Sequence, residues 1–157
     1  MSYIIGIDIG LDGAIAVFND GKLVSIHDMP TLTIESNKKA KRQIAAGDLA
    51  YLLCEPEIDH AYVERPASRP GQSVVAMFNF GRSLGVVQGV LAALQIPVTY
   101  VAPATWIKAI GKPAGKDGSR HRAMELFPDQ LDLFKRVKDD GRAEAALIAT
   151  WGMQKNG

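Results

Sequence analysis

The sequence predicts an α/β domain built on a mixed five-stranded sheet flanked by helices, and three observations lead to that prediction. Three β-rich runs open the chain and are separated by the turn signals LDG and NDG, which favour tight hairpin connections. Helix-like and strand-like segments then alternate to the end of the chain. Strands joined through helices pair in parallel, so an antiparallel meander of three strands is extended by two parallel strands.

Each element has its own signal. The strands are predicted in SYIIGIDIG, GAIAVFN, GKLVSIHDM, DHAYVERP and IPVTYVA, and the helices in AAGDLAYLLCE, from Ser73 to Leu94, around ATWIKAI, from about Ser119 to Leu126 and from about Gly141 to Gln154. TLTIESNKKAKRQ has no clean period and carries four cations in five positions, so it is predicted as a loop. The order β-β-β-α-β-α-β-α is that of the ribonuclease H-like fold, and also of one half of an actin or sugar-kinase ATPase.

Length and composition favour one soluble domain over residues 1–157. Apolar residues make up 47% of the chain and charged residues 22%, which is ordinary for a globular protein and unlike a disordered chain. The N-terminus lacks the pattern of a signal peptide, and no apolar run predicts a membrane span, so a cytoplasmic location without membrane contact is expected. The single Cys54 suits a reducing compartment. A net charge of +1 gives no argument for nucleic acid from bulk charge alone.

Four acids stand out by their context. Asp8 lies within the apolar run IIGIDIG, where an unpaired carboxylate is costly to bury, and Glu64 ends the fourth strand. Asp140 and Glu144 are four residues apart at the start of the last helix, which places them on one helix face about 5–6 Å apart at Cβ. Hard oxygen ligands of this kind suit Mg²⁺, or Mn²⁺ in its place. Two such ions can activate a water and stabilise the leaving oxygen in phosphodiester cleavage.

Each acid also has a structural alternative. Asp8 could be satisfied by the backbone of the GLDG turn, and Glu64 could pair with Arg65 or Arg69. Asp140 could simply cap the final helix, in which case Asp139 could take its place in the site. Glu144 could face solvent. The sequence alone leaves these alternatives open.

Five segments, IIGIDIGLDGAIAVF, AYVERP, FNFGRSLGVVQGVL, VAPATWIKAIG and GRAEAALIA, resemble the RuvC-type Holliday junction resolvases. The resemblance implies a homodimeric, Mg²⁺-dependent endonuclease with a ribonuclease H-like fold that cuts four-way DNA junctions by paired nicks. It also implies that Asp8, Glu64 and Glu144 hold metal. Family members often carry two aspartates three residues apart, but the residue three before Glu144 is Gly141, so Asp140 is the best substitute.

Cations are grouped where such an enzyme needs to attract DNA. Lysines and arginines that contact phosphates give affinity without sequence preference. In RuvC-like proteins a lysine-bearing segment lies near the cut phosphate. This resemblance implies that Lys116 is the catalytic lysine, and Lys112 is the second candidate. The predicted DNA-binding residues are Lys38, Lys39, Lys41, Arg42, Arg65, Arg69, Lys108, Lys112 and Arg120.

The long helix from Ser73 to Leu94 carries too much apolar surface for one face, and it sets Gly81, Gly85 and Gly89 four apart. Packing on the sheet explains one side, and a two-fold partner would use another. Trp106 is predicted to pack in the core rather than to stack on a base.

The predicted function is therefore a metal-dependent nuclease that resolves four-way DNA junctions. The alternatives are a nuclease for other branched DNA such as forks and flaps, a DNA-binding module without catalysis, and an ATP-binding actin or sugar-kinase relative. The last is disfavoured because such proteins need two lobes around the nucleotide.

Overall fold

A computed structural model describes residues 1–37, 39–65 and 70–156. Its central sheet has five strands in the order β3-β2-β1-β6-β7. The first three pair antiparallel, while β6 and β7 pair in parallel with β1 and β6 respectively. The predicted meander with two parallel additions is therefore confirmed. The strands are β1 (Tyr3–Asp8), β2 (Ala14–Asn19), β3 (Lys22–Asp28), β6 (His60–Glu64) and β7 (Val98–Val101).

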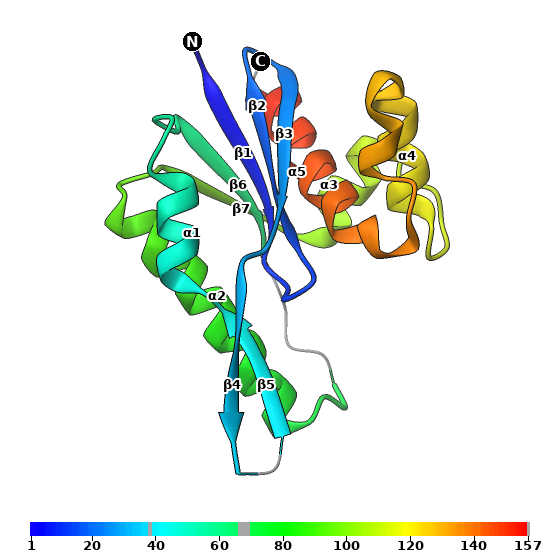
Figure 1. The fold of residues 1–157 in the computed structure, drawn as a ribbon. Coiled ribbons are helices and arrows are strands. Elements are labelled where there is room, and N and C mark those ends of the chain that lie inside the picture. The colour runs from blue at the N-terminus through cyan, green and yellow to red at the C-terminus, as the bar shows by residue number, and fades with distance from the viewer. Residues whose placement is uncertain (38, 66–69, 157) are drawn as a thin grey trace.

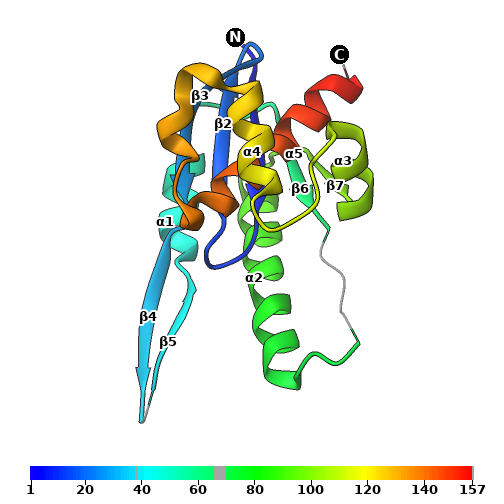
Figure 2. The same cartoon turned by 90° about the vertical axis from the view of Figure 1, so that its right-hand side faces the viewer.

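Helices cover both faces of this sheet (Figures 1 and 2). On one face, α1 (Ala46–Leu53) and α2 (Val74–Ala93) pack over Ile5 and Ile7 of β1. On the other, α5 (Asp140–Asn156) lies against the sheet with α3 (Pro103–Ile110) and α4 (Gly118–Leu126) beside it. Two short 3₁₀ segments, η1 (Pro128–Leu133) and η2 (Val137–Asp139), complete the path into α5.

The prediction of a loop at TLTIESNKKAKRQ is wrong. These residues form a separate antiparallel hairpin of β4 (Thr31–Ser36) and β5 (Lys39–Ile44). The alternation of Leu32 and Ile34 with threonines is a strand pattern that the neighbouring run of cations obscured. The hairpin projects away from the main sheet on the same side as the start of α2 (Figure 1).

The helix α2 has a packed half and an exposed half. Val87 and Leu91 are buried against the sheet, whereas Val74, Val75 and Phe78 are 83%, 63% and 67% exposed. The second half of α2 therefore belongs to the core, whereas the apolar side chains of its first half lie outside it. Its length and mean hydropathy would also allow it to cross a membrane, which the sequence analysis did not foresee. The contacts of its second half with the sheet are those of a core helix in a globular domain.

Candidate active site

The candidate site begins where two parallel strands end side by side. In the pairing of β1 with β6, Ile4 lies opposite His60 and Ile7 opposite Val63. The same register continued by one residue places Asp8 beside Glu64. Each carboxylate thus leaves a rigid strand rather than a loop, at the carboxyl edge of the sheet, where open α/β sheets bind their ligands.

The last helix brings two more acids to this edge. A Cβ on Gly6 would overlap the carbonyl oxygen of Ala145 and lie 2.8 Å from the Cβ of Ala149, so the glycine lets α5 lie directly against β1. This close packing carries the first two turns of α5 over the ends of the strands. Asp140 and Glu144 therefore join Asp8 and Glu64, and we call these four residues the strand-end carboxylates.

Burial raises the pKa values of Asp8, Asp140 and Glu144, and repulsion from the neighbouring acids adds to the shifts of Asp8 and Glu144. Burial raises the pKa of Asp8 to about 6, opposed by a hydrogen bond from the Gly10 N–H and increased by the charges of Glu64 and Asp140. Burial raises the pKa of Glu144 to about 8, and the charges of Asp8, Asp140 and Glu64 add to this shift. Since like charges gathered in a buried place are typical of functional sites, the four acids form one electrostatic unit.

The structure separates the roles of Asp139 and Asp140. Asp139 is 1% exposed and accepts hydrogen bonds from the Arg136 side chain and backbone N–H, and its Oδ1 lies 3.8 Å from Arg142 Nη1. Burial alone would raise the pKa of Asp139, but these arginines outweigh it and lower that pKa. The pKa of Asp140 is raised, chiefly by burial. Asp139 is therefore committed to a structural ion pair, which leaves Asp140 to the carboxylate site.

Gly141 explains the departure from the aspartate spacing of the RuvC-like pattern. A Cβ at this position would overlap the carbonyl oxygen of Asp12 and lie 2.9 Å from the Cα of Gly13. The turn after β1 thus packs against the start of α5 and leaves no room for a side chain. An acidic side chain at position 141 is therefore incompatible with this packing, and the adjacent acid is Asp140.

The donor chemistry of the strand-end carboxylates fits a hard divalent cation. All four side chains end in carboxylate oxygens, and the raised pKa values of Asp8, Asp140 and Glu144 mark negative charge that a cation would stabilise. Within residues 1–37, 39–65 and 70–156, no group of three acidic, histidine or cysteine side chains is already arranged to hold an ion. A bound cation would therefore draw these side chains closer together.

A cavity of about 590 Å³ gives access to this edge. Asp8, Asp12 and Asp140 line it together with Arg42. Arg42 reaches from β5 to donate to the Asp12 carboxylate at 2.9 Å and to the Leu11 carbonyl at 3.1 Å. The hairpin is thus tied to the turn that follows β1, a contact that the sequence analysis missed because it predicted no hairpin.

The remaining predicted cations lie in several places. Lys112 is half-buried, and its charge lowers the pKa values of Asp140 and Glu144, whereas Lys116 is exposed and its charge acts on Asp117. This places Lys112 nearer the carboxylates than Lys116. Lys38 and Arg69 lie outside the described residues. Those on the exposed surface are Lys39, Lys41, Arg65 and Lys108.

The assignment of Arg120 to DNA binding is corrected by its surroundings. Its side chain is buried, donates to the carbonyls of Phe134 and Lys135, and forms a 2.6 Å ion pair with Asp117. A guanidinium held in this way joins α4 to the segment after η1. Arg120 is therefore a structural residue.

Trp106 is buried in the core, as predicted, but it also touches the site. Its side chain is 0% exposed, and the indole Nε1–H donates to Glu64 Oε2 at 2.6 Å. The two residues are 42 positions apart, so no local sequence pattern reveals the contact. In the sequence, Trp106 lies two residues before Lys108 in a short amphipathic helix. That pattern indicates packing in the core and no contact with the site.

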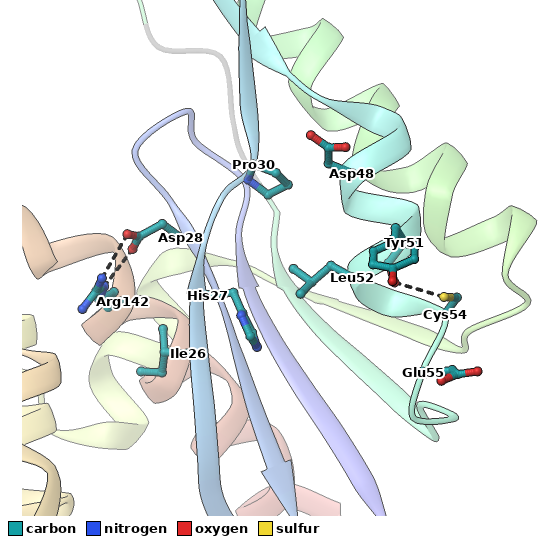
Figure 3. Close-up of a pocket in the computed structure, with 10 residues that line it drawn as sticks. All are labelled: Ile26, His27, Asp28, Pro30, Asp48, Tyr51, Leu52, Cys54, Glu55 and Arg142. Atoms are coloured by element: carbon teal, nitrogen blue, oxygen red, sulfur yellow. Dashed lines mark hydrogen bonds and ion pairs between the residues drawn. The ribbon is translucent and has the colours of Figure 1, made fainter.

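A second cavity of about 810 Å³ lies away from the strand-end carboxylates (Figure 3). It follows the end of β3 and the side of α1, where Tyr51 and Leu52 line it. At its border Asp28 accepts two hydrogen bonds from Arg142, which lower the pKa of that carboxyl. None of the predicted catalytic residues lines this cavity.

Comparison with solved structures places this arrangement in a known fold. RuvC of T. thermophilus, in complex with a Holliday junction substrate, matches with a TM-score of 0.66 and 17% sequence identity, over 100% of this chain and 97% of that chain. The chain has the RuvC fold. Yeast mitochondrial Holliday junction resolvase Ydc2 shares it with a TM-score of 0.56 and 18% identity, over 98% of this chain and 78% of that chain. The predicted ribonuclease H-like fold is thereby confirmed.

Sequence comparison points in the same direction. The chloroplastic Holliday junction resolvase MOC1 of Chlamydomonas reinhardtii is 30% identical over 152 residues, which cover 83% of this chain. The match spans only 17% of that protein's length. No protein-family model matches the sequence. The resemblance to Holliday junction resolvases thus rests on both sequence similarity and the RuvC fold.

Proposed function

We propose that this protein is a metal-dependent endonuclease that resolves four-way DNA junctions. The observation that carries the proposal is the meeting of Asp8, Glu64, Asp140 and Glu144 at the carboxyl edge of a sheet with the RuvC fold. The names of the similar proteins, which are Holliday junction resolvases of chloroplast, mitochondrion and bacterium, support the choice of substrate.

In this proposal the strand-end carboxylates hold Mg²⁺, or Mn²⁺ in its place. Bound divalent ions supply a nucleophilic water at neutral pH and neutralise charge on the leaving oxygen. Asp8 and Glu64 fix the position of the site on the sheet, while Asp140 and Glu144 close it from α5. Attack of water on phosphorus breaks the bond to the 3′ oxygen, which leaves 5′-phosphate and 3′-hydroxyl ends.

Cations near this edge bind the scissile strand. The charge of Lys112 acts on Asp140 and Glu144 and lowers their pKa values. This lysine therefore offsets the repulsion between those acids and the DNA phosphates. Lys116, which is exposed on the same loop, extends this positive charge toward the DNA. Lys39 and Lys41 on the projecting hairpin, together with Arg65 and Lys108, contact more distant phosphates.

The exposed half of α2 is the proposed surface of a homodimer. Val74, Val75 and Phe78 are exposed, and the space beside Gly81, Gly85 and Gly89 is open. A two-fold partner on this surface would bury it and place two sites on one symmetric junction.

The test compares cleavage of an end-labelled four-way junction, a fork and a linear duplex of the same sequence, with and without Mg²⁺. Wild type is expected to make paired cuts in the junction, and Asp8→Asn is expected to bind the junction without cutting it. Equal cutting of forks would widen the substrate to branched DNA in general.

A DNA-binding module without catalysis is the second candidate. It is favoured by the finding that, among the described residues, no three side chains already form a set ready to bind a metal. Binding of the junction with no cleavage in either Mg²⁺ or Mn²⁺ would support this candidate and overturn the nuclease proposal.

A further inference from the structure

The contact between Trp106 and Glu64 joins the core to the candidate site. Glu64 ends β6 and lies opposite Val101, the last residue of β7, in the parallel register. The Arg65 N–H donates to the Val101 carbonyl at 2.7 Å, which holds the two strand ends together beyond the last pair. The helix α3 starts two residues after β7, with Pro103 in its first turn. Its first turn therefore lies beside the end of β6.

The position of Trp106 in α3 directs its indole toward Glu64. Thr105 and Trp106 donate their backbone N–H groups to the Ala102 carbonyl, which fixes the first turn of the helix. The ring is packed in the core with Ile110 and Phe134 and is 0% exposed. An aromatic side chain enclosed in this way has one rotamer, so its N–H points in a fixed direction.

The chemistry of the contact suits a carboxylate whose orientation toward a metal ion must be fixed. Indole Nε1–H is a donor only and needs an acceptor when it is buried. It donates to Glu64 Oε2 at 2.6 Å. A neutral donor orients a carboxylate without adding a positive charge that would compete with a cation.

We propose that Trp106 is a positioning residue that holds Glu64 in the orientation needed to bind the divalent ion. This inference rests on the proposed nuclease function, since it concerns the metal site of that reaction. Loss of a hydrogen bond that orients a metal ligand typically costs about 10–100-fold in metal affinity. The expected effect of removing the indole N–H is of that size.

The first test uses Trp106→Phe, which keeps an aromatic ring and removes the N–H. Its matched control is Trp151→Phe, because Trp151 is also buried but packs against Tyr62 and Lys155. Mn²⁺ affinity is measured by calorimetry, and the Mg²⁺ concentration for half-maximal junction cleavage is measured in parallel. Trp106→Phe is expected to weaken Mn²⁺ binding and raise the Mg²⁺ requirement by about 10–100-fold, with junction binding unchanged. Trp151→Phe is expected to change neither quantity.

A double-mutant cycle shows whether the effect passes through Glu64. In a Glu64→Gln background, Trp106→Phe should cause little further loss of Mn²⁺ affinity, because the ligand that it orients is already altered. Full additivity of the two losses would overturn the proposal, since it would mean that Trp106 acts elsewhere.

A measurement on the wild type keeps the inference testable if Trp106→Phe does not fold. The chain has two tryptophans, so its ¹⁵N spectrum holds two indole N–H signals, assigned with Trp151→Phe. Mg²⁺ should shift the Trp106 signal and leave that of Trp151 in place, and an unmoved Trp106 signal on a metal-bound protein would overturn the inference. A wild type that binds no metal and cuts no junction overturns the proposed function, and the positioning role with it. A wild type that cuts normally beside an unaffected Trp106→Phe overturns the positioning role alone.

Discussion

The two ends of this molecule are built in opposite ways. At the strand-end carboxylates, charges are buried among close backbone contacts at Gly6, Gly13 and Gly141, and each acid comes from a strand end or the start of a helix. In the projecting lobe, which we define as the hairpin β4–β5 with residues 74–82 of α2, apolar and cationic side chains face outward. The backbone of the first end is held by close packing, whereas the second end offers side-chain surface that a partner would cover. Mutations at the strand-end carboxylates should therefore change the cleavage rate, and mutations in the projecting lobe should change the binding of partners.

The largest effect is expected at Asp140, and the neighbouring aspartate supplies its control. Asp140→Asn removes a proposed metal ligand, so junction cleavage should fall by more than the about 10–100-fold that loss of an outer-shell partner typically costs, while the free energy of unfolding is maintained. Asp139→Asn breaks the buried ion pair with Arg136 and should cost about 2–3 kcal/mol of stability, with cleavage by the folded protein retained. Cleavage rates per folded molecule and urea denaturation distinguish the two. The reverse pattern would reassign the ligand to Asp139.

A second large effect concerns the pH dependence of stability without metal. The pKa of Glu144 is raised from 4.5 to about 8 in the folded protein, so the folded state binds this proton more tightly than the unfolded state. The corresponding stability is present at pH 4.5 and is lost as pH rises toward 8. Glu144→Gln should flatten this loss, and Mg²⁺ should stabilise wild type more at pH 8 than at pH 5. Thermal denaturation in EDTA measures the pH dependence of stability, and the same measurement in Mg²⁺ gives the stabilisation by metal. If stability depends on pH in the same way in wild type and Glu144→Gln, Glu144 does not lie in a buried, acid-rich environment.

The contrast between the two ends also explains what the sequence could predict. The strands of the main sheet and the helices α1 to α5 were predicted because periodicity and turn residues are local signals. The sequence singled out Asp8 and Glu64 separately, but their convergence depends on the parallel pairing of β1 with β6. The spacing of acids before Glu144 in the sequence fits Asp139 and Asp140 equally well. The choice between them depends on which way the first turn of α5 faces, and only the folded structure shows that.

Other features could not be read from residue type alone. Arg120 was counted with the surface cations because nothing in its neighbourhood shows that two carbonyls and Asp117 enclose it. The hairpin was missed because four cations mask its alternating pattern. Contacts such as Trp106 with Glu64 depend on the folded arrangement of distant segments.

A moderate effect is expected on the exposed half of α2. Phe78→Glu places a charge on a side chain that is 67% exposed and that lies 5.7 Å below the Arg82 guanidinium. If this surface joins two copies, the dissociation constant should rise by at least tenfold, about 1.4 kcal/mol. Tyr51→Glu, on α1 and 82% exposed, is the control that should leave association unchanged. Sedimentation equilibrium measures the dissociation constants, and a weakened dimer should make single nicks instead of paired cuts.

The dimer surface would be refuted by a monomeric wild type, or by equal association of wild type and Phe78→Glu. Stable association with lipid vesicles would instead favour the membrane reading that the length and hydropathy of α2 allow.

The smallest effect is expected from the cations of the hairpin. Lys39 and Lys41 are exposed on β5, and each phosphate contact that they make releases about one counterion when DNA binds. Lys39→Ala and Lys41→Ala should each reduce the slope of log K against log salt by about 1, with little change in the cleavage rate of bound junction. The control is Lys22→Ala, because Lys22 is the first residue of β3. The strand β3 begins at the end of the sheet opposite the hairpin (Figure 1). Equal salt slopes for all three variants would show that the hairpin is not part of the DNA interface. The role of the hairpin would then be limited to Arg42, which donates to Asp12 and supports the turn beside the carboxylate site.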